Sequence, residues 1–399
     1  MASFPVPGSS YRGPAPEYAG FRASQPLVRL PAAGGGRCWV ATTHESVRVV
    51  LDDVRFSRAA SYEPTAPTFP GLFQAPPGMI ISLDPPDHTR LRNLVTQAFS
   101  VERIEAMRPR IRQLVGELLD RAAEEALEGP VDLLGKFTFP LAIIAISDLL
   151  GVPAEERDTF ARLIREFAAV DAPEIAAAAG EKLGEYMAAL VFGKMNAPGD
   201  DVLSALTQVR IGDDRLEVGE LIGLGYTLLG AGGDSTACHL ASSILTTLGQ
   251  DIWVRLGEHP EEVPAAVEEL LRWITLSTND TTGLPRIALE DVTLFGVTVP
   301  KGDAVFVSTN SANRDSAVFA DPDTLDFARV GEHLAFGHGI HRCLGAPLAR
   351  IELVTAFEEL TRRFPAARLA VAEEALEWQQ ADMNHRLVAL PVDLHGKWS

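Results

Sequence analysis

The stretch Phe336–Gly345 reads FGHGIHRCLG and places one cysteine, Cys343, among three glycines. Glycine is used where a backbone must take a positive φ or pass close to another flat group. Behind this stretch, Ala346–Arg363 carries apolar residues at helical spacing, so Cys343 is predicted to lie just before a helix N-terminus. The helix dipole favours a thiolate over a thiol at that position. The stretch therefore predicts a loop that presents a thiolate to a metal.

A buried structural cysteine is the first alternative, because a lone cysteine usually behaves as a small hydrophobic residue. Such a residue needs neither glycines at fixed offsets on both sides nor the preceding Phe336. The second alternative is a zinc-dependent hydrolase that uses His338, His341 and Cys343. A structural zinc site takes four ligands, and Cys38 and Cys238 stand alone without C-x-x-C spacing.

Composition limits the class of protein and its partners. The 399 residues carry 35 Lys and Arg against 54 Asp and Glu, a net charge of −19, which disfavours nucleic acid as a partner. The chain is 46% hydrophobic and 22% charged, as ordinary globular proteins are. No secretory signal is visible over Met1–Gly20, and no apolar stretch is long enough to span a membrane. We therefore expect a cytoplasmic protein with no membrane partner, and the three widely spaced cysteines suit a reducing compartment.

The complete pattern F-x-x-G-x-x-x-C-x-G resembles the haem-binding loop of the cytochrome P-450 family of haem-thiolate monooxygenases. The resemblance implies a mainly α fold with small β-sheets, built as a single domain over residues 1–399 around a buried haem b. Cys343 would be the axial ligand of the haem iron, and Phe336 and Gly345 would shape the loop beside the haem. Eukaryotic members usually carry a membrane anchor, so the chain looks like a bacterial member.

The haem propionates would be held by basic side chains from three parts of the chain. His88 and Arg92 lie four residues apart and share one helix face, although spacing alone favours a solvated face. The resemblance assigns this pair, together with Arg286 and His341, to the two propionates.

A glycine cluster, Gly230-Ala-Gly-Gly-Asp-Ser-Thr236, lies inside a helix predicted over Val218–Gly249. Glycines there weaken a helix, so either close helix packing or a local widening must account for them. The resemblance implies that Ala231 and Gly232 leave room for dioxygen and that Asp234 and Ser235 relay protons. Serine replaces the threonine usual in the family, and its hydroxyl is expected to be held less tightly because serine is not β-branched.

A helix predicted over Val263–Trp273 contains Glu269 and Arg272. Glutamate and arginine three residues apart are common on any helix. In the family such a pair joins an arginine from a later segment, here Arg329, and the resemblance implies that the three fix the loop that carries the cysteine.

Residues 1–36 form an irregular lead-in, and the proline-rich segment 57–83 is predicted to roof the substrate pocket. Polar residues over 277–282 suggest a substrate with amide or hydroxyl groups, although a solvated loop explains them almost as well. The candidate substrate contacts are Phe69, Phe73, Met79, Ile80, Thr278, Asn279, Met383 and Asn384.

The implied activity is hydroxylation, epoxidation or oxidative coupling of a small hydrophobic molecule, in bacterial natural-product biosynthesis. No G-x-G-x-x-G follows a predicted strand, so NAD(P)H would act only through a ferredoxin and its reductase, on a monomer. A haem-binding sensor or carrier remains an alternative. The candidate docking residues for an acidic donor are Arg103, Arg108, Arg110, Arg112, His338 and Arg342.

Overall fold

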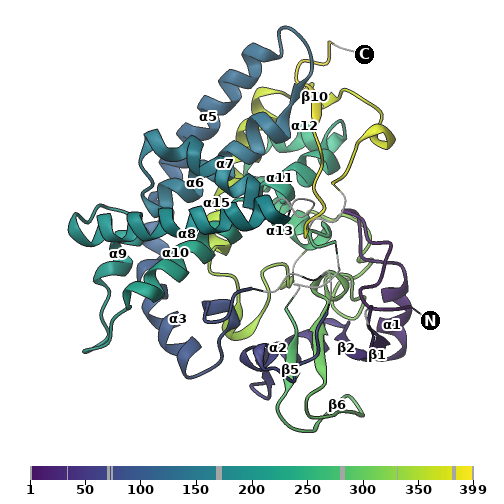
Figure 1. Cartoon of the computed structure of the whole chain (residues 1–399). Helices are drawn as coiled ribbons and strands as arrows, with labels where there is room; N and C mark the ends of the chain where they lie inside the picture. The colour runs from purple at the N-terminus through teal and green to yellow at the C-terminus, as the bar shows by residue number, and fades with distance from the viewer. Residues whose placement is uncertain are drawn as a thin grey trace. The chain divides into compact units, whose positions relative to one another are not determined.

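The computed structural model describes residues 2–33, 35–69, 72, 75–167, 173–278, 284–329, 331–379 and 383–397 (Figure 1). The chain divides into two compact units. The first, the sheet unit, contains Met1–Thr89, Glu268–Cys343 and Met383–His385. The second, the helical unit, contains Arg90–Val267, Leu344–Asp382 and Arg386–Ser399. That the two make a single domain stays a prediction.

The sheet unit is built on a five-stranded sheet in the order β1-β2-β8-β5-β3. Its antiparallel pairs join β1 to β2, β8 to β5, and β5 to β3, whereas β2 and β8 run parallel. A separate ribbon pairs β6 with β7. The strands are β1 (Leu27–Pro31), β2 (Arg37–Ala41), β3 (Phe56–Ser57), β5 (Arg286–Ala288), β6 (Val292–Leu294), β7 (Val297–Val299) and β8 (Ala304–Val307).

Strand β8 lies at the centre of this sheet and is buried along its whole length. Its side chains alternate between two apolar clusters, because successive residues of a strand point to opposite faces. Val305 and Val307 pack with the apolar face of a helix, and Phe306 packs with Phe4 and Tyr18. The helices of this unit are α1 (Glu17–Ser24), α2 (His44–Asp52), α14 (Thr309–Ala312) and the 3₁₀ turns η1 (Ala59–Tyr62), η2 (Ile80–Ser82) and η6 (Gly339–His341).

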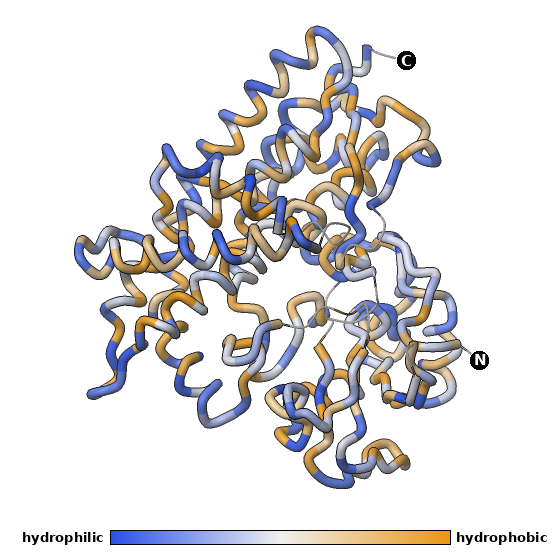
Figure 2. The backbone as a smooth tube through the Cα atoms, viewed as in Figure 1, coloured by the Kyte–Doolittle hydropathy of each residue, from blue (hydrophilic) through white to orange (hydrophobic). Residues whose placement is uncertain are grey.

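The helical unit is mostly α-helix, with apolar and polar residues alternating along the helices (Figure 2). Helix α10 packs against α6 and α8, and α15 packs against α5, α11 and α12. The α-helices are α4 (Val101–Ala106), α5 (Arg108–Glu125), α6 (Phe139–Leu150), α7 (Arg157–Phe167), α8 (Pro173–Asn196), α9 (Val202–Gln208), α10 (Val218–Gly232), α11 (Asp234–Thr247), α12 (Asp251–Glu258) and α15 (Ala346–Arg363).

The remaining elements of the helical unit are short. A three-stranded sheet has the order β4-β10-β9, and η3 is a π-helical turn. Two helices, α3 (Asp87–Ala98) and α13 (Val263–Trp273), have residues in both units. The short elements are β4 (Val131–Asp132), β9 (Arg368–Leu369), β10 (Pro391–Asp393), η3 (Leu134–Thr138), η4 (Ala154–Glu156), η5 (Pro260–Glu262) and η7 (Glu373–Ala375).

The mainly α fold class with small sheets is confirmed, and the helices predicted over 263–273 and 346–363 have those bounds. The continuous helix predicted over Val218–Gly249 was wrong. It is two helices, α10 and α11, interrupted at Gly233. Among the helices that the structure describes, none combines the length and the apolar character that a bilayer crossing requires.

Candidate functional site

The loop that carries Cys343 is shaped by two glycines with positive φ. Gly337 has φ +69° and Gly339 has φ +68°, a conformation that other residues rarely adopt. At Gly339 a Cβ atom would also lie 2.8 Å from the carbonyl oxygen of Leu51, at the end of α2. The amide of Cys343 donates to the carbonyl oxygen of Phe336 at 2.9 Å, which closes the loop. The residue is exposed.

Helix α15 begins three residues after Cys343, with Gly345 as its N-cap residue. The sulfur is therefore carried just before a helix N-terminus, as the sequence predicts. The third glycine differs from the other two, because Gly345 has φ −78° in the right-handed region. Positive φ accounts for two of the three glycines of the loop.

His88 and His341 come from distant parts of the sequence but lie together in the sheet unit. Their ring centroids are 4.2 Å apart, with planes inclined at 52°, and the side chain of His88 is buried. Arg92 lies one turn further along α3, within the helical unit, and is half-buried. The structure thus brings two of the predicted propionate ligands into contact.

Arg286 begins strand β5 and is only 2% exposed. Burial, and then the positive charge of Arg58, hold the pKa of its guanidinium well below the ordinary value. Among the described residues, its Nη1 and Nη2 atoms have no hydrogen-bond acceptor. A buried cation is costly unless an anion accompanies it. A haem propionate is an anion of the right chemistry, so the residues present fit the cofactor.

A zinc site in the same loop has no support. His338 points its Nε2 atom at Asp52 Oδ2, 3.0 Å away. In the described part of the chain, no three His, Cys, Asp or Glu side chains come close enough to hold a metal ion. The other thiols belong to the interior: Cys38 and Cys238 are buried, and burial raises the pKa of Cys38 to about 12.

The glycine cluster between α10 and α11 is a place of close helix packing. A Cβ atom on Gly233 would lie 2.5 Å from Cδ1 of Ile143, and one on Gly232 would lie 2.9 Å from Cδ1 of Ile146. Both isoleucines belong to α6. Packing therefore accounts for these two glycines. The two helices are interrupted at Gly233, although its backbone stays in the right-handed helical region, with φ −82° and ψ −62°. That Ala231 and Gly232 border dioxygen stays a prediction.

Asp234 and Ser235 open α11, directly after the interruption. The Ser235 hydroxyl donates to the carbonyl oxygen of Ala231 at 2.8 Å. The carbonyl at the end of α10 thus supplies an acceptor that sequence alone does not reveal, and the expectation that serine is held less tightly than threonine stays a prediction. Oδ1 of Asp234 lies 2.5 Å from Nη2 of Arg386, and the Cys238 thiol lies 3.8 Å from the same oxygen.

The predicted Glu–Arg–Arg set is a single buried network. Both oxygens of Glu269 accept from Arg272 at 2.7 Å, and one of them also accepts from Nε of Arg329 at 3.1 Å. Arg272 donates in addition to the carbonyl oxygens of Asn313 and Pro322, at 2.7 and 2.8 Å. The network therefore ties α13 to the segment that leads into the Cys343 loop.

The candidate substrate contacts divide into three groups that the structure describes and one pair that it does not. The backbone and the hydroxyl of Thr278 both donate to the carbonyl oxygen of Met383, and Ser277 forms a bridge with Asn384, so these two segments lie side by side. Phe69 packs on the rings of Phe306 and Phe4, which explains its position without a substrate. Met79 is half-buried and Ile80 is buried in η2. Phe73 and Asn279 lie outside the described residues.

Comparison with known proteins identifies the family. The cytochrome P450 family model matches residues 261–375. Nocardicin C N-oxygenase of Nocardia uniformis subsp. tsuyamanensis is 45% identical over 387 residues, and the match covers 94% of each chain. Mycinamicin IV hydroxylase/epoxidase of Micromonospora griseorubida is 41% identical, again over 94% of each chain. The chain belongs to the cytochrome P450 family.

Solved structures of bacterial P450s share the whole fold. A mutant of the mixed-function P450 MycG in complex with mycinamicin V superposes with a TM-score of 0.90 at 39% identity, covering 98% of this chain and 99% of that one. The LnmA hydroxylase from the leinamycin biosynthetic pathway of Streptomyces atroolivaceus S-140 also gives a TM-score of 0.90, at 40% identity and 98% and 100% coverage. The predicted enzyme class, a cytochrome P450 monooxygenase, is confirmed.

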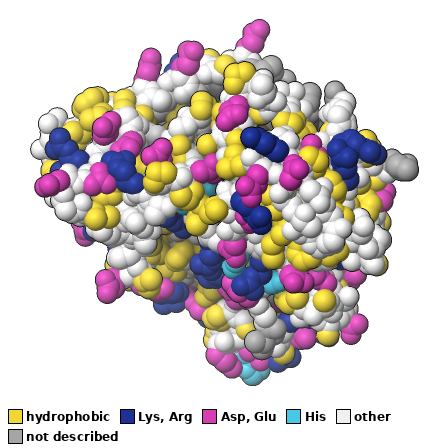
Figure 3. Space-filling view, turned by 90° about the horizontal axis from the view of Figure 1, so that it is seen from below, with side chains coloured by type: hydrophobic (Ala, Val, Ile, Leu, Met, Phe, Trp, Pro, Cys, Tyr) yellow, Lys and Arg dark blue, Asp and Glu magenta, His cyan; other side chains and the backbone are white. Residues whose placement is uncertain are grey.

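The predicted donor-docking arginines of this P450 are paired with acids. Arg103 lies 3.1 Å from Asp200. Arg110 lies 2.8 Å from Asp148. Arg108 and Arg112 are paired in the same way with Glu105 and Glu358. On the face drawn in Figure 3, basic side chains lie among acidic ones. The positive field of these residues is thus partly cancelled, and Arg342, which is exposed, remains a candidate.

Three further residues of this P450 were not singled out by the sequence. Arg58 is buried beside Arg286, and Arg386 holds the predicted relay acid. Glu352 is fully buried in α15, where burial raises the pKa of its carboxyl well above the ordinary value.

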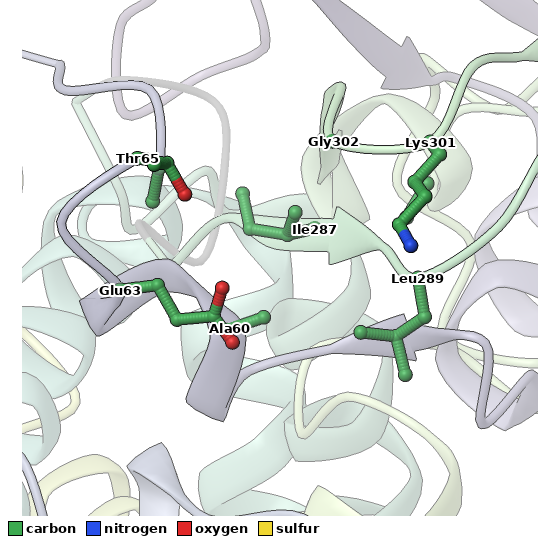
Figure 4. Close-up of a pocket in the computed structure, with 9 residues that line it drawn as sticks. Ala60, Glu63, Thr65, Ile287, Leu289, Lys301 and Gly302 are labelled. Carbon is green, nitrogen blue, oxygen red and sulfur yellow. The ribbon is translucent and has the colours of Figure 1, made fainter.

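A shallow pocket of about 270 Å³ opens on the sheet unit between η1 and β5 (Figure 4). Ile287 and Leu289 line it, and the side chains of Glu63 and Lys301 stand on opposite sides of it. None of the residues predicted to contact haem, dioxygen or substrate lines this pocket. We assign it no part in the reaction.

Proposed function

We propose that this P450 inserts oxygen into, or oxidatively couples, a small hydrophobic molecule in bacterial natural-product biosynthesis. The observation that carries the proposal is the exposed Cys343, held before α15 by a loop with two glycines of positive φ. Relatives named for hydroxylation, epoxidation and N-oxygenation of antibiotics support the substrate class. Hydroxyl and amide groups on the substrate would suit the polar segment at Thr278 and Asn384, where two chain segments meet.

Cys343 would ligate the haem iron, and His88, Arg92, Arg286 and His341 would hold the propionates by charge-assisted hydrogen bonds. When bound, the haem supplies the oxygen-activating chemistry that its thiolate ligand favours. Insertion of one oxygen atom consumes two electrons and two protons and releases one water.

Protons would be moved by the residues that open α11. Asp234, which is paired with Arg386, and the Ser235 hydroxyl, which lies on the Ala231 carbonyl, would form the relay. The buried network around Glu269 would keep the Cys343 loop in place. These roles rest on the geometry within each unit and on the family.

Electrons would arrive from a ferredoxin and its reductase. Neutralising Arg342 together with Arg110 should slow reduction by the ferredoxin at low salt and less at high salt, because exposed charges are screened over about 8 Å at physiological ionic strength. Stopped-flow reduction rates measured over a salt series test this partner. A rate that does not change at low salt would place the docking face elsewhere.

The decisive experiment is the carbon monoxide difference spectrum of Cys343→Ser. The variant should lose the strongly red-shifted Soret band that a thiolate ligand gives, whereas Cys38→Ser and Cys238→Ser should keep it, since both of those thiols are buried. A Cys343→Ser variant that retains the band would overturn the proposal. Substrate class is then tested by titrating natural products and following the low-spin to high-spin shift.

A further inference from the structure

Helix α2 ends beside the loop that carries Cys343. Val47, Val50 and Leu51 of this helix are buried in the apolar cluster on one face of the central strand β8. A capping box closes the first turn of the helix. Both ends of α2 are thus held, and its C-terminus is a fixed point of the sheet unit.

The loop contacts this fixed point in two ways. Nε2 of His338 donates to Oδ2 of Asp52 at 3.0 Å, and a carboxylate acceptor makes this bond stronger than one between neutral groups. The backbone of Gly339 also passes close to the end of α2. A Cβ atom on Gly339 would lie 2.7 Å from Oδ1 of Asp52 and 2.8 Å from the carbonyl oxygen of Leu51. The second contact therefore leaves room for glycine alone.

Hydrogen bonds inside the loop have a different effect. The amide of Cys343 donates to the carbonyl oxygen of Phe336 at 2.9 Å. The amide of Arg342 donates to the carbonyl oxygen of Gly339 at 3.0 Å. These bonds fix the shape of the loop, whereas its position depends on contacts with other elements, of which the end of α2 is one.

We propose that the end of α2 positions the Cys343 loop and that Asp52 is the positioning residue, acting through His338. The inference rests on the proposed function, in which the loop presents its thiolate to the haem iron. Asp52 is 56% exposed, but the side chain of His338 is only 17% exposed, so the pair stabilises the loop more than a surface ion pair would. Loosening this contact should affect the thiolate ligand before it affects the fold.

The test is the rate at which the ferrous carbonyl complex of the holoenzyme loses its red-shifted thiolate band. Each variant is held the same number of degrees below its own unfolding midpoint, so that a general loss of stability does not count. Asp52→Ala should lose the band about two- to tenfold faster than the parent, the range expected for one hydrogen bond. His338→Ala should behave alike, and the double variant should be no faster, because both changes remove the same contact. His338→Gln keeps a side-chain donor and should lie close to the parent rate.

The matched control is Glu332→Ala. It removes an acid of the same charge, which lies 3.8 Å from Arg48 of the same helix. This control should lose the thiolate band at the parent rate. A parent rate in Asp52→Ala would overturn the inference. A parent protein that shows no thiolate band would instead overturn the proposed function.

Two glycines of the loop give an independent comparison. Gly337 and Gly339 have almost the same positive φ, +69° and +68°, so alanine strains the backbone equally at either position. Among the described residues, a Cβ atom on Gly337 meets nothing within 4 Å, whereas one on Gly339 meets the end of α2. Gly339→Ala should therefore lose the thiolate band faster than Gly337→Ala. Equal rates would contradict the inference, and this comparison decides the matter if Asp52→Ala fails to fold.

Discussion

Asp234 and Arg386 form an ion pair in which Oδ1 of the aspartate lies 2.5 Å from Nη2 of the arginine. The two side chains are 14% and 17% exposed, so the pair is shielded from solvent on most sides. Arg386 is itself held by its backbone, since its carbonyl oxygen accepts from the amide of Gln379 at 2.8 Å. The predicted relay acid is thereby fixed to the C-terminal segment, two residues from the candidate substrate contact Asn384.

We predict that Arg386 acts on proton delivery through Asp234. In a double-mutant cycle, Arg386→Leu and Asp234→Asn should each raise the peroxide released per electron consumed, and the double variant should release no more than Asp234→Asn alone. The same cycle on thermal stability should give a coupling free energy of about 1–3 kcal/mol, typical of a charged hydrogen bond.

The control for this cycle is Arg368→Leu, which removes another arginine of the C-terminal region, one paired with Asp393 at 3.4 Å. Peroxide yield in this variant should stay at the parent value. Additive effects of Arg386→Leu and Asp234→Asn on peroxide yield would show that the arginine has a structural role only.

Ser235 gives a second prediction about the peroxide released per electron consumed. Ser235→Ala removes the hydroxyl that donates to Ala231 and should raise the peroxide yield. Ser235→Thr keeps a hydroxyl whose rotation is restricted by the β-branch, so the yield should fall or stay unchanged. Peroxide is measured with the true substrate. An alanine variant as tightly coupled as the parent would assign the relay to Asp234 and water.

The buried Glu269 network should contribute more to the free energy of unfolding than an exposed ion pair does. Glu269→Gln leaves two buried arginines with an uncharged partner and should cost about 3–5 kcal/mol in the free energy of unfolding. Glu105→Gln is the matched control, because Glu105 and Arg108 have the same three-residue spacing on an exposed surface. The control should cost about 0–1 kcal/mol. Denaturant midpoints compare the two, and equal losses would contradict the prediction.

His385 should make stability depend on pH. Burial lowers the pKa of its imidazole from 6.5 to about 4, so the unfolded chain binds more protons between these values and stability rises with pH across that range. The contribution amounts to about 3 kcal/mol at 1.36 kcal/mol per pH unit. His385→Gln lacks it, so the difference in unfolding free energy between parent and variant should change between pH 4 and 6.5. A constant difference would rule out this assignment.

The parts of the site that sequence predicts well are those where chemistry and backbone constraint lie in one short segment. The Cys343 loop needs glycines at fixed offsets, and Gly337 and Gly339 do take positive φ. The sequence could predict which three residues form the Glu269 network, because the family pattern gives their order along the chain. Its geometry, with both carboxylate oxygens used, required the structure.

The parts that sequence missed depend on pairing between distant segments. Arg58 stands out only because the turn that follows β3 lies beside Arg286, and Arg386 only because its segment returns to Asp234. Neither residue stands in a motif that a local pattern would single out. The interruption at Gly233 was missed for a related reason, since the apolar pattern continues through it and the close packing against α6 is seen only in the structure.

The close approach of Gly233 to Ile143 links the side chains that these two positions can carry. A methyl group at position 233 and Cδ1 of Ile143 would occupy the same space, so the chain can hold one of these carbons but not both. Shortening the isoleucine by Ile143→Val removes that carbon and makes room for Gly233→Ala, which on its own favours helix by about 1 kcal/mol. The paired substitution is thus a route to a stronger helical preference at the junction between α10 and α11, directly before Asp234 and Ser235.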